Sequence, residues 1–163
     1  MILDSGERRE FESGAVRDIQ EGKGRCDLLP LEEVADLLCD TVLWCLWAST
    51  HANNREKRDD MIRECFIEFC KKRGWSCEEA MLEVSKHFED GAKKYGEWNW
   101  QKGIPTHSYV DSAVRHYLKW ADGKEDEPHD RAFVWNLLCM MYTLHNKPEF
   151  DDLIGKEKGD GGE

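Results

Sequence analysis

Two histidines and two carboxylates stand close together in the second half of the sequence. Asp126, Glu127 and His129 fall within one short turn, and His116 precedes them on a segment that reads as helical. Mg²⁺ prefers carboxylate oxygens, whereas a neutral imidazole can bind metal or act as a general base. The pattern indicates metal ligands at Asp126 and Glu127 and catalytic groups at His116 and His129. Ordinary helix capping is the alternative explanation of the two carboxylates.

The segment before this turn carries two polar pairs with helical spacing. Asp111 and Arg115 are four residues apart, and so are Ser112 and His116. Residues at this spacing meet on one face of a helix, so an arginine, a carboxylate and a histidine can act together. A surface ion pair beside a hydrogen-bonded histidine is the competing interpretation.

Residues 91–108 combine aromatic and basic side chains within an acidic chain. Aromatic planes can stack on a nucleotide base, and lysines can meet phosphates. The residues in question are Lys93, Lys94, Tyr95, Trp98, Trp100 and Lys102. The alternative is that the tryptophans cover one end of a helical bundle while the lysines stay in solvent.

Two weaker signals also indicate a site for a nucleotide. Arg17, Lys23 and Arg25 alternate with glycines, and a basic glycine-rich segment can wrap a phosphate, although the P-loop pattern is absent. Asn136 is the polar exception in an otherwise apolar segment. A buried amide must find partners, so Asn136 either locks the packing or contacts a base edge or a sugar.

The elements that must position these residues are predicted to be helices. Apolar residues recur at three-and-four spacing, and no run shows the sustained alternation of a strand. The predicted helices cover residues 31–49, 58–73, 77–95, 108–121 and 128–145, with an exposed link at 50–59. We therefore predict an all-α fold, a helical bundle of about five helices with an N-terminal glycine-rich arm.

The same reading divides the chain into three parts. Residues 1–10 are expected to be a flexible N-terminus, 11–153 a single helical nucleotide-handling domain, and 154–163 a disordered tail. Since the last predicted helix is apolar almost all round, it should lie at the centre of the bundle.

Composition limits the classes of partner. The 163-residue chain has a formal net charge of −11, so a broad basic surface for long DNA or RNA is not expected. A mononucleotide needs only a few local cations, or a divalent metal held by carboxylates. Seven cysteines without a CxxC pair favour free thiols in a reducing compartment. With no apolar stretch of membrane-spanning length and no signal peptide, we expect a cytoplasmic protein without a membrane partner.

Several segments together resemble a known family. FESGAVRDIQEGKGRCDLLP resembles the opening of a phage-type domain, the N-terminal domain of dATP/dGTP diphosphohydrolase. GAKKYGEWNWQKGIP, SYVDSAVRHYLKW, GKEDEPH and WN resemble later parts of that domain in the same order, so that the resemblance covers residues 11–30 and 87–144. It implies a helical domain of bacteriophage origin that hydrolyses purine deoxynucleoside triphosphates. Its motif positions here are Gly14, Arg17, Asp18, Lys23, Gly24, Arg25, Lys94, Tyr95, Asn99, Trp100, Arg115, His116, Asp126, His129 and Asn136.

With this resemblance we expect a nucleotide pyrophosphohydrolase that acts on purine deoxynucleoside triphosphates with Mg²⁺, or with Mn²⁺ as the alternative metal. Asp126, Glu127 and Glu89 are the expected metal ligands, and His116 or His129 would position or deprotonate the attacking water. The expected nucleotide-binding residues are Arg17, Lys23, Arg25, Lys94, Tyr95, Asn99, Trp100, Arg115 and Asn136.

The main alternative is a non-catalytic phage protein that binds a nucleotide signal and sequesters it. It would use the same aromatic and basic residues but would need neither a base nor a metal. In both hypotheses the partner is a small-molecule nucleotide in the host cytoplasm, and a homo-oligomer is expected because helical bundles commonly place sites between subunits.

Overall fold

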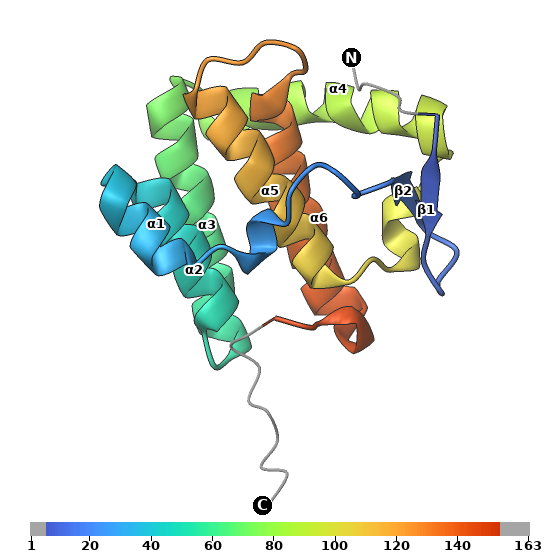
Figure 1. Ribbon diagram of the computed structural model, residues 1–163, viewed down its shortest axis with the longest axis horizontal. Helices are drawn as coiled ribbons and strands as arrows, with labels where there is room; N and C mark the ends of the chain where they lie inside the picture. Colours follow the sequence, from blue (N-terminus) through green and yellow to red (C-terminus); the bar gives the residue numbers. More distant parts are fainter. Residues whose placement is uncertain (1–5, 154–163) are drawn as a thin grey trace, which may run out of the picture.

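Six α-helices account for most of residues 6–153, the part of the chain that the computed structural model describes (Figure 1). They are α1 (Leu31–Leu38), α2 (Thr41–His51), α3 (Arg55–Arg73), α4 (Cys77–Tyr95), α5 (Thr106–Ala121) and α6 (His129–Asn146). Three short 3-10 helices accompany them: η1 (Cys26–Leu28), η2 (Asn99–Lys102) and η3 (Pro148–Phe150). The expected helical bundle is confirmed.

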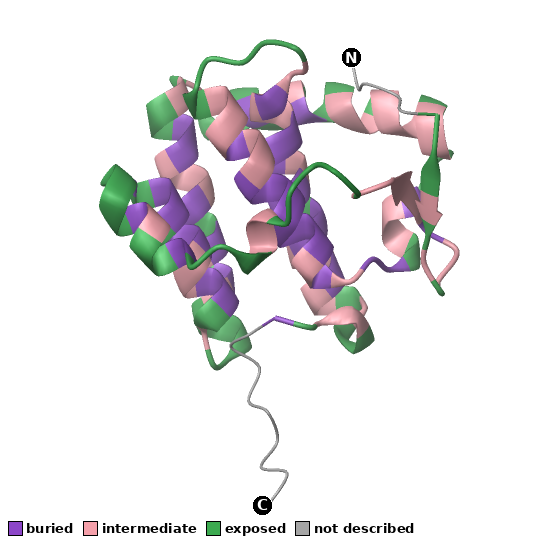
Figure 2. Ribbon diagram, viewed as in Figure 1, coloured by how far each residue is buried: buried purple, intermediate pink, exposed green. Residues whose placement is uncertain are grey.

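The central layer of the bundle is the pair α5 and α6. Helix α6 packs on α5, α4 and α3, and α2 packs on α3. Buried positions concentrate along α5 and α6 in the middle of the molecule (Figure 2). Phe133, Leu137 and Met140 of α6 and Tyr117 of α5 are almost completely buried. The central place predicted for the last helix follows from its apolar surface.

The ends of α3 and α4 follow local capping signals. The Asn54 side chain accepts a hydrogen bond from Lys57 N at 2.9 Å, and Ser76 does the same for Glu79 N at 3.1 Å. Gly74 ends α3 in the left-handed conformation, with φ of 82°. Asparagine and serine favour the N-cap and glycine the left-handed position after a helix, so both helices begin and end at sequence signals.

The single helix predicted over residues 31–49 is wrong, because the chain breaks it into α1 and α2. Cys39 adopts the left-handed conformation with φ of 49°. Asp40 then caps α2 by accepting from Leu43 N at 3.0 Å. Its carboxylate also accepts hydrogen bonds from the Lys72 ammonium at 2.9 Å and from the Tyr117 hydroxyl. These tertiary partners fix Asp40 as a helix start.

The N-terminal segment is more regular than the expected arm. β1 (Arg8–Glu10) pairs antiparallel with β2 (Val16–Asp18), so part of the predicted flexible N-terminus is a strand. Gly14, with φ of 83°, lies in the connecting turn. Strands of three residues are too short to show an alternating pattern in the sequence. The expected disordered tail at 154–163 lies outside the described residues, as do residues 1–5.

The predicted exposed link at residues 50–59 is mostly helical. Helix α2 continues to His51 and α3 begins at Arg55, and Thr50 and Asp59 are buried.

All seven cysteines lie in the described part of the chain and are free thiols. No helix within residues 6–153 combines the length and apolarity that crossing a membrane requires.

Candidate functional site

A cavity of about 560 Å³ opens between the N-terminal hairpin and the helices α4, α5 and α6. The hairpin and the turn after it form one wall, and β1 and β2 stand beside the C-terminal end of α4 (Figure 1). The cavity brings together sequence-predicted residues from four regions of the chain: Arg17, Lys23, Tyr95, Asn99, Arg115, His116, Asp126, Glu127 and Asn136.

Several predicted site residues lie outside this cavity. The Arg25 guanidinium is largely exposed and pairs with Asp27 at 2.7 Å. Trp100 packs edge-on against Tyr142, with ring centroids 4.8 Å apart. Glu89 is exposed on α4 and does not line the cavity. The structure therefore does not place Glu89 with the other two predicted metal ligands.

Three side chains form a hydrogen-bonded chain that ends at the cavity. Asp126 Oδ1 lies 2.7 Å from His129 Nε2, and His129 Nδ1 lies 2.9 Å from His116 Nδ1. The His129 side chain is fully buried, although it belongs to the first residue of α6. The hydrogen bond from His129 lowers the pKa of Asp126, so the carboxylate is ionised and accepts.

These hydrogen bonds assign one tautomer to each ring when both rings are neutral. A neutral imidazole has one N–H and one lone pair. With both rings neutral, His129 Nε2–H donates to Asp126, His129 Nδ1 accepts, and His116 Nδ1–H donates to it. The lone pair of His116 is then on Nε2. Burial, and next the neighbouring His129, hold the pKa of His116 well below its usual range, so this ring is neutral.

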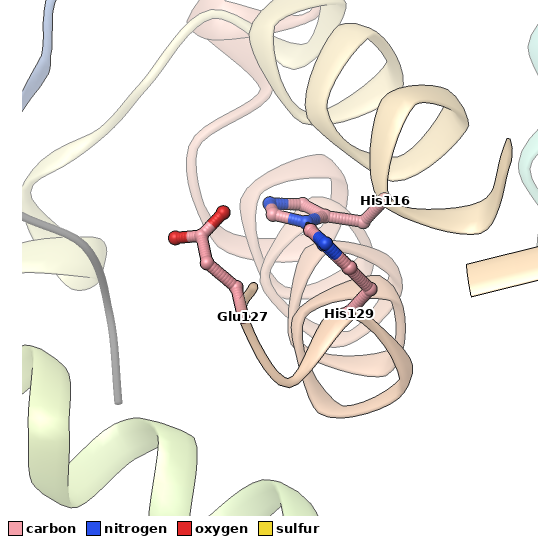
Figure 3. A group of neighbouring side chains, drawn as sticks. All are labelled: His116, Glu127 and His129. Carbon is pink, nitrogen blue, oxygen red and sulfur yellow. The ribbon is translucent and has the colours of Figure 1, made fainter. Parts of the chain in front are cut away.

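Glu127 stands opposite the free edge of His116. Figure 3 shows the second ring nitrogen of His116 on the side of the Glu127 carboxylate, with His129 on the other side. Ligand atoms of His116, Glu127 and His129 lie within 4.8 Å of one another. Both His129 nitrogens already make hydrogen bonds, so Glu127 is the best metal donor of the three, and the Nε2 lone pair of His116 stays available as a base. The Glu127 carboxylate fits a divalent ion that completes its shell with water and phosphate oxygens.

Arg17 crosses the cavity wall and contacts both central helices. Its Nη2 donates to Ser112 Oγ of α5 at 3.0 Å and to Asn136 Oδ1 of α6 at 3.4 Å. The guanidinium also lies over the rings of Tyr109 and Trp135, 5.5 and 5.6 Å from their centroids. Asn136, the predicted polar exception of the last helix, thus holds a cation at the cavity.

The pair Asp111–Arg115 fixes the backbone next to Lys23. Arg115 Nη2 donates to Asp111 at 2.6 Å and to the Gly24 carbonyl at 2.6 Å, and Asp111 accepts from Cys26 N at 2.7 Å. The Lys23 side chain lines the cavity and makes no hydrogen bond or ion pair to any described residue. Burial lowers the pKa of this ammonium. An anionic ligand would meet a cation that no side chain within residues 6–153 pairs.

Asn99 and Lys94 hold the hairpin to the rest of the fold. Asn99 Oδ1 accepts from Val16 N at 2.9 Å, and its Nδ2 donates to the Val16 carbonyl at 2.8 Å. Lys94 Nζ donates to Asp18 at 2.8 Å. Both residues were expected to bind nucleotide, but their polar groups in this structure position the cavity wall.

Sequence reasoning missed two polar residues that line the cavity. Arg9 was assigned to a flexible N-terminus, yet it lies on β1 and its Nε atom is buried without a partner among the described residues. His87 lies on α4, and its Nδ1 atom is likewise buried without a partner. The helical spacing of His87, Gly91 and Tyr95 is the signal that could have indicated a shared face.

Comparison with known families gives one match. A family model described as dATP/dGTP diphosphohydrolase, N-terminal, matches residues 52–153, which is more than half of the chain. The protein belongs to this family. No curated protein and no solved structure gave a match. The match spans α3 to α6.

The family match and the expected resemblance overlap but differ in extent. The match includes residues 52–86, which the resemblance left uncovered, and it begins after the N-terminal segment that the resemblance included. The paired histidines and both carboxylates of the turn lie inside the matched range, whereas Arg9, Arg17 and Lys23 lie before it. The cavity is therefore lined both by residues inside the matched range and by residues that precede it.

Proposed function

We propose that this protein hydrolyses purine deoxynucleoside triphosphates in the cavity, with a divalent metal that arrives with the nucleotide. The observation that carries this proposal is the chain Asp126–His129–His116, which presents a lone pair to a cavity lined by cations. Membership of the dATP/dGTP diphosphohydrolase family supports the substrate class.

Lys23, Arg17 and Arg9 are the groups proposed to bind the phosphates. All three line the cavity and come from the N-terminal hairpin or the turn after it. Since the chain has a net charge of −11, these cations are a local departure from the overall charge. Buried cations contribute most where charge builds up on transferring phosphoryl oxygens.

His116 is the proposed general base. Its Nε2 lone pair takes a proton from water while the water oxygen forms a bond to phosphorus and a phosphoanhydride P–O bond breaks. The leaving phosphate oxygen keeps the electron pair. His129 accepts the Nδ1–H hydrogen bond of His116, and Asp126 compensates the positive charge that develops on the imidazole pair.

Glu127 is the proposed protein ligand of the metal, together with nucleotide oxygens. When bound, a divalent ion neutralises phosphate charge and polarises the phosphoryl oxygens. Mg²⁺ is the proposed ion and Mn²⁺ the alternative. A carboxylate together with phosphate oxygens suits Mg²⁺, which prefers oxygen ligands.

The test is turnover of the four common deoxynucleoside triphosphates with Mg²⁺ or Mn²⁺, with products identified by mass. We expect hydrolysis of dATP and dGTP, and a decrease of kcat by about 10²- to 10⁴-fold in His116→Gln, the range for loss of a general base. Metal affinity should be unchanged in this variant. His145→Gln is the matched control, because His145 also bonds a carboxylate, Asp59 at 2.8 Å, away from the cavity. Intact nucleotide after prolonged incubation with either metal would refute hydrolysis.

A non-catalytic nucleotide-binding function is the second candidate. The observation that favours it is that Asp18, Asp111 and Asp126 are each engaged by a basic or imidazole side chain. Few carboxylates then remain for metal. The same experiment separates the two functions, since a binding protein would raise its melting temperature with nucleotide yet release it unchanged.

A further inference from the structure

One face of α4 lines the cavity but takes no part in the proposed chemistry. His87, Gly91 and Tyr95 follow one another at intervals of four residues, and all three line the cavity. Residues at this spacing lie above one another on one side of a helix. The face therefore consists of two rings with bare backbone between them.

Gly91 leaves open space in front of this backbone. A Cβ atom added there would meet no atom within 4 Å, and Gly91 has an ordinary helical backbone. Glycine is less favourable than alanine inside a helix, so its use normally reflects a need for space or close approach. No side chain of the described residues fills that space. A ligand surface approaching the helix is what would use it.

His87 supplies an unsatisfied polar atom next to this gap. Its Nδ1 is buried and has no hydrogen-bond partner in the described part of the chain, while its ring lies 5.6 Å from the ring of Trp135. Burial lowers the pKa of His87 to about 4, so the ring is neutral. Because nearly all buried polar atoms in folded proteins have partners, this nitrogen points to a bound molecule.

Arg17 connects the α4 face with the proposed catalytic histidines through its contacts. On α5, His116 lies one helical turn beyond Ser112, the partner of Arg17. The guanidinium also lies over the ring of Trp135, which contacts His87. A nucleotide extended along this line would place its phosphates near Arg17 and His116 and its base at α4.

We propose that the face of His87, Gly91 and Tyr95 is the purine-base subsite, an inference that rests on the proposed hydrolysis of nucleotides in this cavity. The base lies against the backbone at Gly91, and His87 Nδ1 contacts its six-position edge. As an N–H, Nδ1 donates to the guanine carbonyl oxygen; in the other tautomer, it accepts from the adenine amine. One neutral histidine thereby accommodates both purines.

The test compares nucleotide and inorganic tripolyphosphate binding in Gly91→Leu. A leucine side chain would occupy the space of the base, so we expect dATP and dGTP binding to weaken by about 10- to 100-fold, as after loss of one stacked base. Tripolyphosphate binding should be unchanged. Ser85→Leu is the matched control, since Ser85 is exposed on the same helix and does not line the cavity.

Three further variants keep the test decisive if Gly91→Leu does not fold. Gly91→Ala adds one methyl group and should weaken purine binding to a smaller extent while raising the melting temperature. His87→Ala should reduce dATP and dGTP affinity but not dCTP affinity, and His87→Gln should recover part of the loss because an amide both donates and accepts.

The outcomes separate this subsite from the proposed function. Wild-type protein that binds no nucleotide would overturn both. Normal purine binding and hydrolysis in Gly91→Leu would overturn the subsite alone, as would an equal loss of tripolyphosphate binding. Selective loss of purine binding with tripolyphosphate binding retained would support it.

Discussion

Asp126 lies at the edge of the cavity and hydrogen-bonds to His129, and we assign it a positioning role that acts on His116 through the His129 ring. Its carboxylate is about half exposed, and the buried His129 ring carries its influence to His116. The proposed mechanism needs this negative charge, because the imidazole pair becomes positive when His116 takes a proton. A neutral amide of the same shape keeps the hydrogen bond but not the charge.

We therefore expect Asp126→Asn to lower kcat for dATP by about 10- to 100-fold, the usual effect of losing a partner that orients a reacting group. KM should change little, since Asp126 is not among the proposed phosphate-binding residues. Steady-state kinetics measures both constants. Asp130→Asn is the control, because Asp130 pairs with Arg73 at 2.9 Å instead of with a histidine. Equal effects of the two substitutions would contradict the positioning role.

Among single residues, the sequence predicted which side chains gather at the cavity better than it predicted the contacts of each one. The histidines and the acidic turn could be recognised because their residue types are unusual and close together. Asn99 and Lys94 could not be separated from ligand-binding residues, because nothing in the sequence shows that their partners are Val16 and Asp18. Such pairings depend on how distant segments meet.

At the scale of elements, the break between α1 and α2 places one residue in an unfavourable backbone conformation. Cys39 has a positive φ, a conformation that costs an L-residue roughly 1–2 kcal/mol and that glycine adopts freely. Cys39→Gly should therefore raise the free energy of unfolding by about 1 kcal/mol. Urea unfolding measures the change. Cys77→Gly, in the first turn of α4, should show no such gain, and a gain in both variants would contradict this explanation.

The helices were predictable where local signals agree with packing. Both ends of α4 follow from Ser76 and Gly96, and the buried stripe of α3 follows from its apolar spacing. The α1–α2 break was missed because residues 31–49 contain neither glycine nor proline, and the partners of Asp40 come from α3 and α5. Similarly, β1 and β2 are held by pairing and by Asn99 rather than by strand-forming composition.

For the whole molecule, buried neutral histidines make stability depend on pH. The pKa of His87 is about 4 in the folded protein and near 6.5 in the unfolded chain. Between these values the unfolded chain binds a proton that the folded protein does not, so stability falls as pH decreases. His116 acts in the same direction. His107 acts oppositely, because its hydrogen bond with Asp152 raises its pKa and stabilises the fold at low pH.

We expect the wild-type protein to lose more stability than His87→Gln as the pH is lowered from 6.5 toward 4. The difference should be roughly 1.4 kcal/mol per pH unit, the slope for one proton. Urea unfolding of both proteins across this range measures it. Curves that stay parallel over the whole range would show that His87 is not protonated selectively in the unfolded chain.

The two hydrogen bonds between Asn99 and the backbone of Val16 make a side-chain amide behave as a peptide group beside β2. The β1–β2 hairpin can move away from the helices only when both of these hydrogen bonds are broken. The Val16 amide hydrogen therefore exchanges with solvent at a rate set by that opening. A nucleotide that bridges Arg17 and the helices should slow this exchange, and Asn99→Ala should accelerate it. Hydrogen exchange at one amide thereby reports how often the cavity admits its ligand, independently of whether any bond in that ligand is cleaved.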